Sequence, residues 1–400
     1  MDVEEYVAFW PRSLWGLARL RLNWGQMVGS VLPSSSPMAG GHGHRVNRRR
    51  NHGAAALRAL AFLLLVTTVV SCSSQAPVSS TTALGPSSAS ASAVSSVPTV
   101  APSPSPSSSF TPVAMTNCDT AIRFDHPPVR VVSADPRFTE ILLALGLEND
   151  VVGTLPAYTS ELQPGLRKAY AALPLIGEDS PTLEKVTAAS PDLIWASPFF
   201  FTEKSIGTRE GWQARGVATY VPAGSCRTSG SSIDDTYTDI LMMGSIFGVS
   251  PVAERLVDEL KASVSATHAR VENASAVRVF VYALLDPGNP PFTRGNLGIA
   301  NDIIGQAGGA NVFAELKGFT QQIGWEEIVK ADPDVIVVLD ADDAAAKKSE
   351  LFSNPIAATL RAVKLGRIIV VPIHSVSTPD LHNAEAVAAL ALGLHPEVFS

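Results

Sequence analysis

The sequence predicts an α/β protein made of two lobes, each with a mostly parallel β-sheet, joined by a single long helix. From about residue 128 onward, short β-branched runs alternate with amphipathic helices, a pattern typical of a covered parallel sheet. Residues 183–195 recur as residues 325–337, each reading as a short helix, a Pro-Asp turn and a buried strand. Between the two halves, residues 252–272 carry the apolar periodicity of one helix.

The first half begins with the clearest local signal. Asp135 is suited to cap a helix, Pro136 to occupy its first position and Gly146 to end it. Runs rich in β-branched and aromatic residues predict the strands of this half at 129–132, 151–153, 193–196 and 217–221. Trp195 ends one of these buried strands, so we expect it in the core.

The second half repeats this order of elements. Ser250-Pro251 is a further cap-and-proline start, and it opens the long helix. Strands are predicted at 277–282, 335–339 and 367–371, and helices at 297–307 and 383–394.

The N-terminal part predicts export. Arginines at positions 45–58 precede a short apolar run, 59–70, and then Ser71-Cys72. This is the plan of a signal peptide, expected over residues 38–71, and the run is too short to span a bilayer. Its ending resembles a bacterial lipobox, so Cys72 is the expected lipidation site; the alternative is an uncleaved anchor. Residues 1–37 fit a start codon that is assigned too far upstream, so we predict no function for them.

Residues 72–117 predict a disordered, lipid-anchored tether. They are almost entirely Ser, Ala, Pro, Thr and Val and cannot bury enough apolar surface to offset their ordering entropy. A flexible chain of this length reaches on the order of 40 Å. A glycosylated stalk is also compatible with this composition. We expect the folded body outside the cytoplasm, tied to the outer face of the membrane.

The remaining cysteines, Cys118 and Cys226, predict a disulfide, because the compartment is oxidising and Cys72 is reserved for lipid. A metal site built from these two alone is a weaker interpretation. The composition, 46% hydrophobic and 17% charged with a net charge of −7, excludes a wholly disordered chain and argues against a nucleic-acid partner.

Several segments together resemble a known family. They are Arg130–Pro136 with Thr139-Glu140, the two Glu…Pro-Asp repeats, Gly295–Asn311, and the closing Leu394–Phe399. The chain is similar to the periplasmic binding proteins whose lobes are joined by one long helix. These are the substrate-binding lipoproteins of ABC importers for ferric siderophores, haem and cobalamin, and the chain looks most similar to actinobacterial ferric-citrate-type members.

The resemblance implies an architecture and a set of partners. It implies Rossmann-like lobes at 118–249 and 274–400 with an interlobe helix at 250–273, moving little on binding. It also implies a monomer that carries no cofactor and delivers its cargo to a membrane permease. In relatives, one Glu on the outer surface of each lobe docks onto the permease, and the matching positions are Glu184 and Glu326. Without the repeat, each would be an ordinary solvated helix residue.

The ligand is expected between the lobes, outside the carboxyl ends of the strands. Arginine suits carboxylate or hydroxamate oxygens, and aromatic side chains offer flat apolar area. The candidate ligand-binding residues are Arg137, Tyr158, Phe199, Phe200, Phe292, Arg294, Trp325 and His374. The alternative role for each of these residues is packing in the core or within a loop. For haem, Tyr158 or His374 would be the axial candidates; a zinc or manganese site of several histidines is disfavoured because only His374 falls in such a loop.

The predicted function is therefore capture of a ferric siderophore or a ferric citrate-like chelate and its delivery to an ABC permease. The alternatives are a haem-binding protein of the same fold and a cell-envelope interaction protein without a small-molecule ligand. An enzyme is disfavoured, because the sequence has no Walker loop, Gly-x-Gly-x-x-Gly after a strand, Gly-x-Ser-x-Gly or His-Glu-x-x-His motif.

Overall fold

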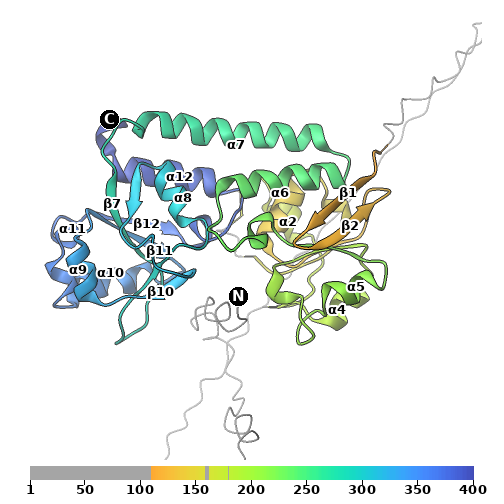
Figure 1. The fold of residues 1–400 in the computed structure, drawn as a ribbon, viewed down its shortest axis with the longest axis horizontal. Helices are drawn as coiled ribbons and strands as arrows, with labels where there is room; N and C mark the ends of the chain where they lie inside the picture. Colours follow the sequence, from red (N-terminus) through yellow and green to blue (C-terminus); the bar gives the residue numbers. More distant parts are fainter. Residues whose placement is uncertain (1–109, 158–161, 179) are drawn as a thin grey trace, which may run out of the picture. The chain divides into compact units, whose positions relative to one another are not determined.

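The computed structural model describes residues 110–157, 162–178 and 180–400, which belong to one compact unit (Figure 1). The predicted signal peptide, Cys72, the predicted tether before residue 110 and Tyr158 lie outside the described residues. Within the described part of the chain, no helix is both long enough and apolar enough to cross a membrane.

The elements follow the predicted order, with some additions. The strands are β1 (Val113–Asn117), β2 (Thr120–Phe124), β3 (Val131–Ser133), β4 (Val151–Thr154), β5 (Leu193–Trp195), β6 (Ala218–Tyr220), β7 (Val277–Tyr282), β8 (Phe292–Arg294), β9 (Gly309–Asn311), β10 (Thr320–Gln322), β11 (Val335–Asp340) and β12 (Ile368–Pro372). The helices are α2 (Pro136–Ala144), α3 (Arg167–Ala171), α4 (Leu183–Ala188), α5 (Arg209–Gln213), α6 (Ile233–Ile246), α7 (Ser250–Val271), α8 (Ala300–Gln306), α9 (Trp325–Ala331), α10 (Ala344–Ser353), α11 (Arg361–Lys364) and α12 (Asn383–Leu394).

The first sheet has the order β4-β3-β5-β6 and is parallel throughout, as the alternation of strands and helices predicts. Because side chains alternate across a strand, its two faces belong to different cores. Val131 and Leu193 pack with α2 and α6, whereas Val132 and Ile194 pack with α4 and α5. Trp195 is fully buried and stacks on Phe138 of α2, with ring centroids 4.8 Å apart, which confirms its predicted place in the core.

The second sheet has the order β12-β11-β7-β9 and is also parallel. Phe280 and Ile336 face α9, α10 and α11, and Val279 and Val337 face α8 and α12. A short antiparallel pair, β8 and β10, extends beyond the end of β7. The second half thus repeats the layered arrangement of the first.

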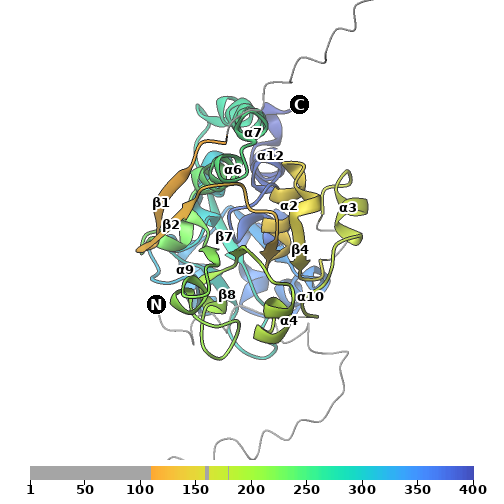
Figure 2. The ribbon, with the colours of Figure 1, turned by 90° about the vertical axis from the view of Figure 1, so that its right-hand side faces the viewer.

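One hydrophobic core runs through both halves. It contains residues of both sheets together with residues of α6, α7 and α12, and these three helices lie side by side along one edge of the unit (Figures 1 and 2). The predicted helix 252–272 is α7, which is about 33 Å long at 1.5 Å per residue. Its close contact with α6 depends on Gly244, where an added Cβ would lie 2.3 Å from Cβ of Ala253.

The folded body begins earlier than the sequence suggested. The tether was expected to extend to residue 117, but β1 already pairs with β2 in an antiparallel hairpin. Cys118 and Asp119 form its turn with positive φ angles of 44° and 64°, which non-glycine residues rarely adopt. A disulfide joins Cys118 to Cys226, and the hairpin packs on the core through Ile122 and Phe124.

Candidate functional site

The two arginines predicted to bind ligand, one from each half, reach neighbouring residues of the same loop. Arg137 lies in the first turn of α2, just after β3, and Arg294 ends β8. Arg137 donates a hydrogen bond from Nη1 to Oγ1 of Thr378, and Arg294 donates one from Nη2 to Oγ of Ser377 at 2.8 Å. Ser377 and Thr378 follow β12, so the site lies at the carboxyl ends of strands from both sheets, as expected for this fold class.

Arg137 is held by its own helix start. The Asp135 carboxylate accepts hydrogen bonds from the backbone N–H and from Nε of Arg137, at 3.0 and 2.8 Å, and so caps α2 while orienting the guanidinium. The predicted cap therefore has a second effect, because the aspartate also offsets the charge of the arginine.

Arg294 is only 1% exposed. Its guanidinium also donates to Oγ1 of Thr320 and lies 4.6 Å from the ring centroid of Phe319. Burial lowers the pKa of Arg294 to about 9. The arginine is thus embedded behind the surface of the junction, whereas Arg137 is only partly buried.

The aromatic candidates separate into two pairs. Phe199 and Phe292 are half-buried, in positions that leave part of each ring accessible. Phe200 and Trp325 are each 6% exposed and belong to hydrophobic cores, so in this structure their side chains pack inward. The turn at Pro198–Phe200 directs Phe200 inward, and Trp325, the first residue of α9, packs edge-on against Tyr282.

His374 lies at the junction, where its ring contacts that of another histidine. Its ring is perpendicular to that of His382, with centroids 5.6 Å apart. Nε2 of His382 lies 2.9 Å from Oε2 of Glu140, which belongs to α2. Burial disfavours the charged imidazole, but the hydrogen bond to Glu140 and the charge of Asp380 raise the pKa of His382 to about 9. Among the described residues, no group of three or more Cys, His, Asp or Glu side chains is arranged to hold a metal ion.

Sequence reasoning missed several residues of this junction, namely Asp135 as a partner of Arg137, Glu140, Phe319, Thr320, Ser377, Thr378, Asp380 and His382. Hydroxyl groups in the loop that follows a strand were a signal that could have indicated Ser377 and Thr378. No local pattern links Glu140 to a histidine near the other end of the folded body.

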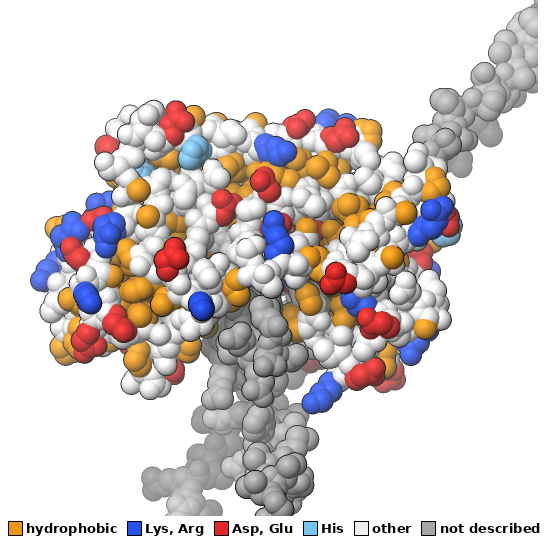
Figure 3. All heavy atoms as spheres, in the orientation of Figure 1, with side chains coloured by type: hydrophobic (Ala, Val, Ile, Leu, Met, Phe, Trp, Pro, Cys, Tyr) orange, Lys and Arg blue, Asp and Glu red, His pale blue; other side chains and the backbone are white. Residues whose placement is uncertain are grey.

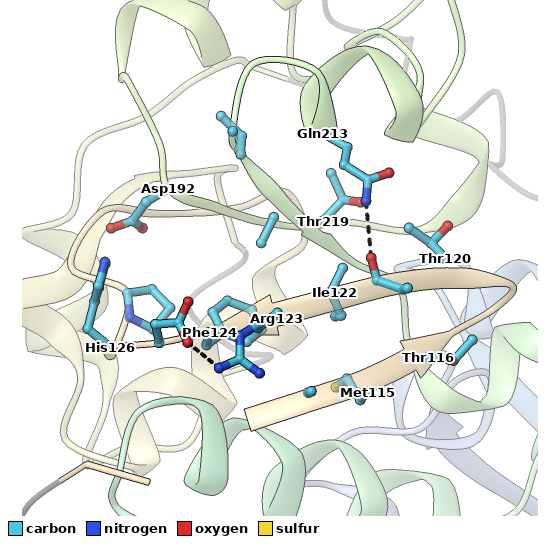
Figure 4. A pocket seen from close by; sticks show the side chains of 17 residues that line it. Met115, Thr116, Thr120, Ile122, Arg123, Phe124, His126, Asp192, Gln213 and Thr219 are labelled. Carbon is cyan, nitrogen blue, oxygen red and sulfur yellow. Dashed lines mark hydrogen bonds and ion pairs between the residues drawn. The ribbon is translucent and has the colours of Figure 1, made fainter. Parts of the chain in front are cut away.

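A separate cavity lies away from this junction. A cavity of about 710 Å³ lies between the β1–β2 hairpin and the amino ends of β5 and β6, where Arg123 pairs with Asp125 and Gln213 bonds to the backbone of Ala121 (Figure 4). None of the predicted ligand-binding residues that the structure describes lines it. This open cavity is at the opposite end of the sheet from Arg137.

The two predicted docking residues occupy equivalent positions. Glu184 is the second residue of α4 and Glu326 the second residue of α9, and both are exposed. Other groups cap these helices, since Thr182 caps α4 and Glu327 closes the first turn of α9. Charged side chains of both signs are interspersed over the face seen in Figure 3, so this face carries no large area of a single sign.

A family model described as periplasmic binding protein matches residues 131–373. An uncharacterized ABC transporter substrate-binding lipoprotein of Bacillus subtilis, YvrC, is 26% identical over 285 residues, covering 71% of this chain and 84% of that protein. A cobalamin-binding protein of Halobacterium salinarum is 26% identical over 282 residues, covering 69% of this chain and 72% of that protein.

A solved structure extends this likeness to the fold. The structure titled ABC-type Fe3+-hydroxamate transport system from Saccharomonospora viridis has a TM-score of 0.61 and 26% identity, covering 72% of this chain and 99% of that chain. The matched regions span both sheets and α7. The chain therefore belongs to the periplasmic binding protein family, and its relatives include substrate-binding proteins of ABC transporters.

Proposed function

We propose that this protein captures a ferric chelate, a siderophore or a ferric citrate-like complex, outside the cytoplasm and delivers it to an ABC permease. One observation carries the proposal. Arginines from both lobes, Arg137 and Arg294, bond to adjacent hydroxyl groups at the carboxyl ends of the strands. A ligand lying there contacts both lobes, as a carrier requires.

The chemistry of the junction favours an oxygen-rich, anionic cargo. A guanidinium presents parallel N–H groups that match carboxylate or hydroxamate oxygens, and hydroxyl groups such as that of Thr378 add donors and acceptors. Phe199 and Phe292 supply partly accessible rings for the organic part of a chelate. Binding and release need no covalent step.

Delivery depends on a rigid two-point contact. Glu184 and Glu326 lie on equivalent helices of the two lobes, and both are exposed. Two carboxylates on one rigid body fix the orientation of a partner as well as attract its basic groups. We infer that they dock onto arginines of the permease, while lipidation at Cys72 keeps the carrier at the outer face of the membrane.

The proposal is tested by calorimetric titration of the detergent-solubilised full chain with ferric citrate, a ferric hydroxamate siderophore, haem and cobalamin. We expect saturable binding of a ferric chelate, weakened at least tenfold by Arg137→Ala. Arg123→Ala is the matched control, because Arg123 is an exposed arginine of the hairpin that pairs only locally with Asp125.

Two other results of the titration would contradict the proposal. Binding of haem alone or cobalamin alone would replace the ferric chelate by that cargo. If none of the four ligands binds, the carrier function fails, and an envelope protein becomes the expected partner.

A further inference from the structure

We propose that Glu140 and His382 are positioning residues that hold the start of α12 against the first lobe and thereby fix the lobe arrangement in which cargo binds. The cargo part of this statement depends on the proposed function. The contact between the lobes does not, so the two can be tested separately.

The inference starts from a short segment of the second lobe, residues 378–383, which we call the α12 cap segment. Residues of the first lobe contact it at three places. Arg137 bonds to Thr378, Glu140 lies 2.9 Å from the His382 ring, and the hydroxyl of Thr236 in α6 donates to Asn383 Oδ1 at 2.9 Å. Three of the six residues of this segment, Thr378, His382 and Asn383, are therefore tied across the junction.

The segment is internally braced, so a contact at one end affects the other. The side-chain amide of Asn383 donates to the carbonyl oxygens of Ser375 and Thr378, at 3.0 and 3.1 Å. Its Oδ1 accepts from the backbone N–H of Asp380 at 2.8 Å. Thr378 accepts from Arg137, and Ser377, the residue before the segment, accepts from Arg294, so the segment helps to position both arginines together with Asp135 and Thr320.

Burial makes the central contact energetically important. Glu140 is 1% exposed, and its other oxygen, Oε1, accepts from the backbone N–H of Gln163. Removing one partner of a buried charged pair leaves the other charge uncompensated, which is strongly destabilising. The lobes are thus held together at this point by more than their shared apolar core.

Four side chains with titratable groups face the His382 imidazole. Glu140 approaches from α2, His374 packs edge-on from the turn after β12, and Asp380 and Glu385 belong to the neighbourhood of His382 itself. Glu385 lies 3.4 Å from Nδ1, but its side chain is 72% exposed and it belongs to the same lobe as His382. Glu385 is therefore a matched control, since its carboxylate lies near the same imidazole but does not connect the two lobes.

The first experiment is hydrogen exchange by mass spectrometry on the unliganded full chain. We expect Glu140→Gln to speed exchange of peptides covering 378–390 and 136–144 at least tenfold, while Glu385→Gln leaves both unchanged. His382→Gln serves as the second variant and is expected to match Glu140→Gln. Unchanged exchange in both junction variants, or equal effects of Glu140→Gln and Glu385→Gln, would overturn the proposal.

The second experiment separates positioning from general stability. In an NMR titration of the histidine rings, Glu140→Gln is expected to lower the pKa of His382 toward its usual range, and Glu385→Gln to have a much smaller effect. Cargo affinity should fall in Glu140→Gln although Glu140 is buried away from the ligand surface. If cargo binds the parent chain and Glu140→Gln equally well, the positioning role fails and the carrier function stands; if exchange responds as expected but no cargo binds, the carrier function fails alone.

Discussion

Asp192 and Asp334 perform the same structural task in the two lobes. Oδ1 of Asp192 accepts from the backbone N–H of Arg130 at 3.0 Å, and Oδ2 of Asp334 accepts from that of Arg278, also at 3.0 Å. In both cases the aspartate follows the Pro of the repeated segment and fastens the start of the adjacent strand. The sequence repeat therefore extends to individual hydrogen bonds.

This equivalence predicts similar costs for two substitutions. Asp192→Ala and Asp334→Ala each leave strand-start N–H groups without their acceptor, and each should lower the free energy of unfolding by about 1–3 kcal/mol. Because the sites are in different lobes, the losses should add in the double variant. Urea unfolding of the full chain measures this. Asp258→Ala, on the exposed side of α7, is the control and should change little.

Asp334 also predicts acid sensitivity. Burial alone would raise the pKa of Asp334, but hydrogen bonds from the backbone of Arg278 and the side chain of Arg361 lower it below its usual value. A lowered folded-state pKa gives a stabilisation that is present above the unfolded pKa and lost as pH falls through the folded pKa. The stability of Asp334→Asn should therefore fall less than that of the parent chain as the pH drops below the ordinary pKa of aspartate. Equal slopes of stability against pH for the two proteins in this acid range would contradict a lowered pKa of Asp334.

A second carboxylate should have the opposite pH dependence. Burial raises the pKa of Asp239 to about 7, although the Tyr220 hydroxyl and the Ala223 N–H, both bonded to its Oδ1, oppose the shift. A raised folded-state pKa means that the folded state binds the proton more tightly than the unfolded state does. The contribution of Asp239 to the free energy of unfolding therefore decreases as pH rises from about 4 to about 7. Each pKa unit corresponds to about 1.4 kcal/mol.

Asp239→Asn removes this titration and should make the loss of stability between pH 5 and pH 7.5 smaller than in the parent chain, as followed by thermal unfolding. Asp234→Asn, an exposed aspartate of the same helix, is the control and should retain the slope of the parent chain. A parent chain whose stability does not decrease over this interval would refute the prediction.

The disulfide predicts a redox effect. Cys118 and Cys226 are 108 positions apart, and a cross-link over so long a loop typically contributes about 2–5 kcal/mol. Dithiothreitol should lower the melting temperature of the full chain. The double variant Cys118→Ser, Cys226→Ser should melt at that lower temperature with or without reductant, and any further decrease on reduction would point to another cause.

Charge reversal tests the docking proposal. Glu184→Lys with Glu326→Lys should reduce uptake of labelled cargo into cells at least tenfold while leaving its affinity for the carrier unchanged, because both side chains are exposed and lie on α4 and α9, which carry neither arginine of the junction. Glu203→Lys, also exposed in the first lobe, is the control. Equal uptake by all three proteins would exclude a docking role for the two glutamates.

The sequence predicted elements best where local signals agree. The strand 277–282 and the helix 383–394 coincide with β7 and α12, and the start of α2 follows from Asp135 and Pro136. The hairpin was missed because its turn places Cys118 and Asp119 at positive φ. Glycine or asparagine usually occupies such positions, and these are the residues by which a hairpin turn is recognised in a sequence.

The site was predicted less completely than the fold. Loops after strands follow from chain order, so the sequence could indicate the region of Arg137 and Arg294. Whether Phe200 or Phe199 faces the core depends on the local turn, which composition does not specify. The pairing of Glu140 with His382 depends on how the two lobes meet. No local sequence pattern around either residue indicates that the two side chains are partners.

The interlobe contact also has a consequence for how the chain acquires its structure. His382 follows Glu140 by 242 positions, so closing this contact requires nearly the whole of the folded body to be present. A first lobe that folds before the rest of the chain is available buries Glu140 while its imidazole partner is still missing. We therefore expect α2 to become firmly protected only when the last helix arrives, which makes this contact a late step in maturation.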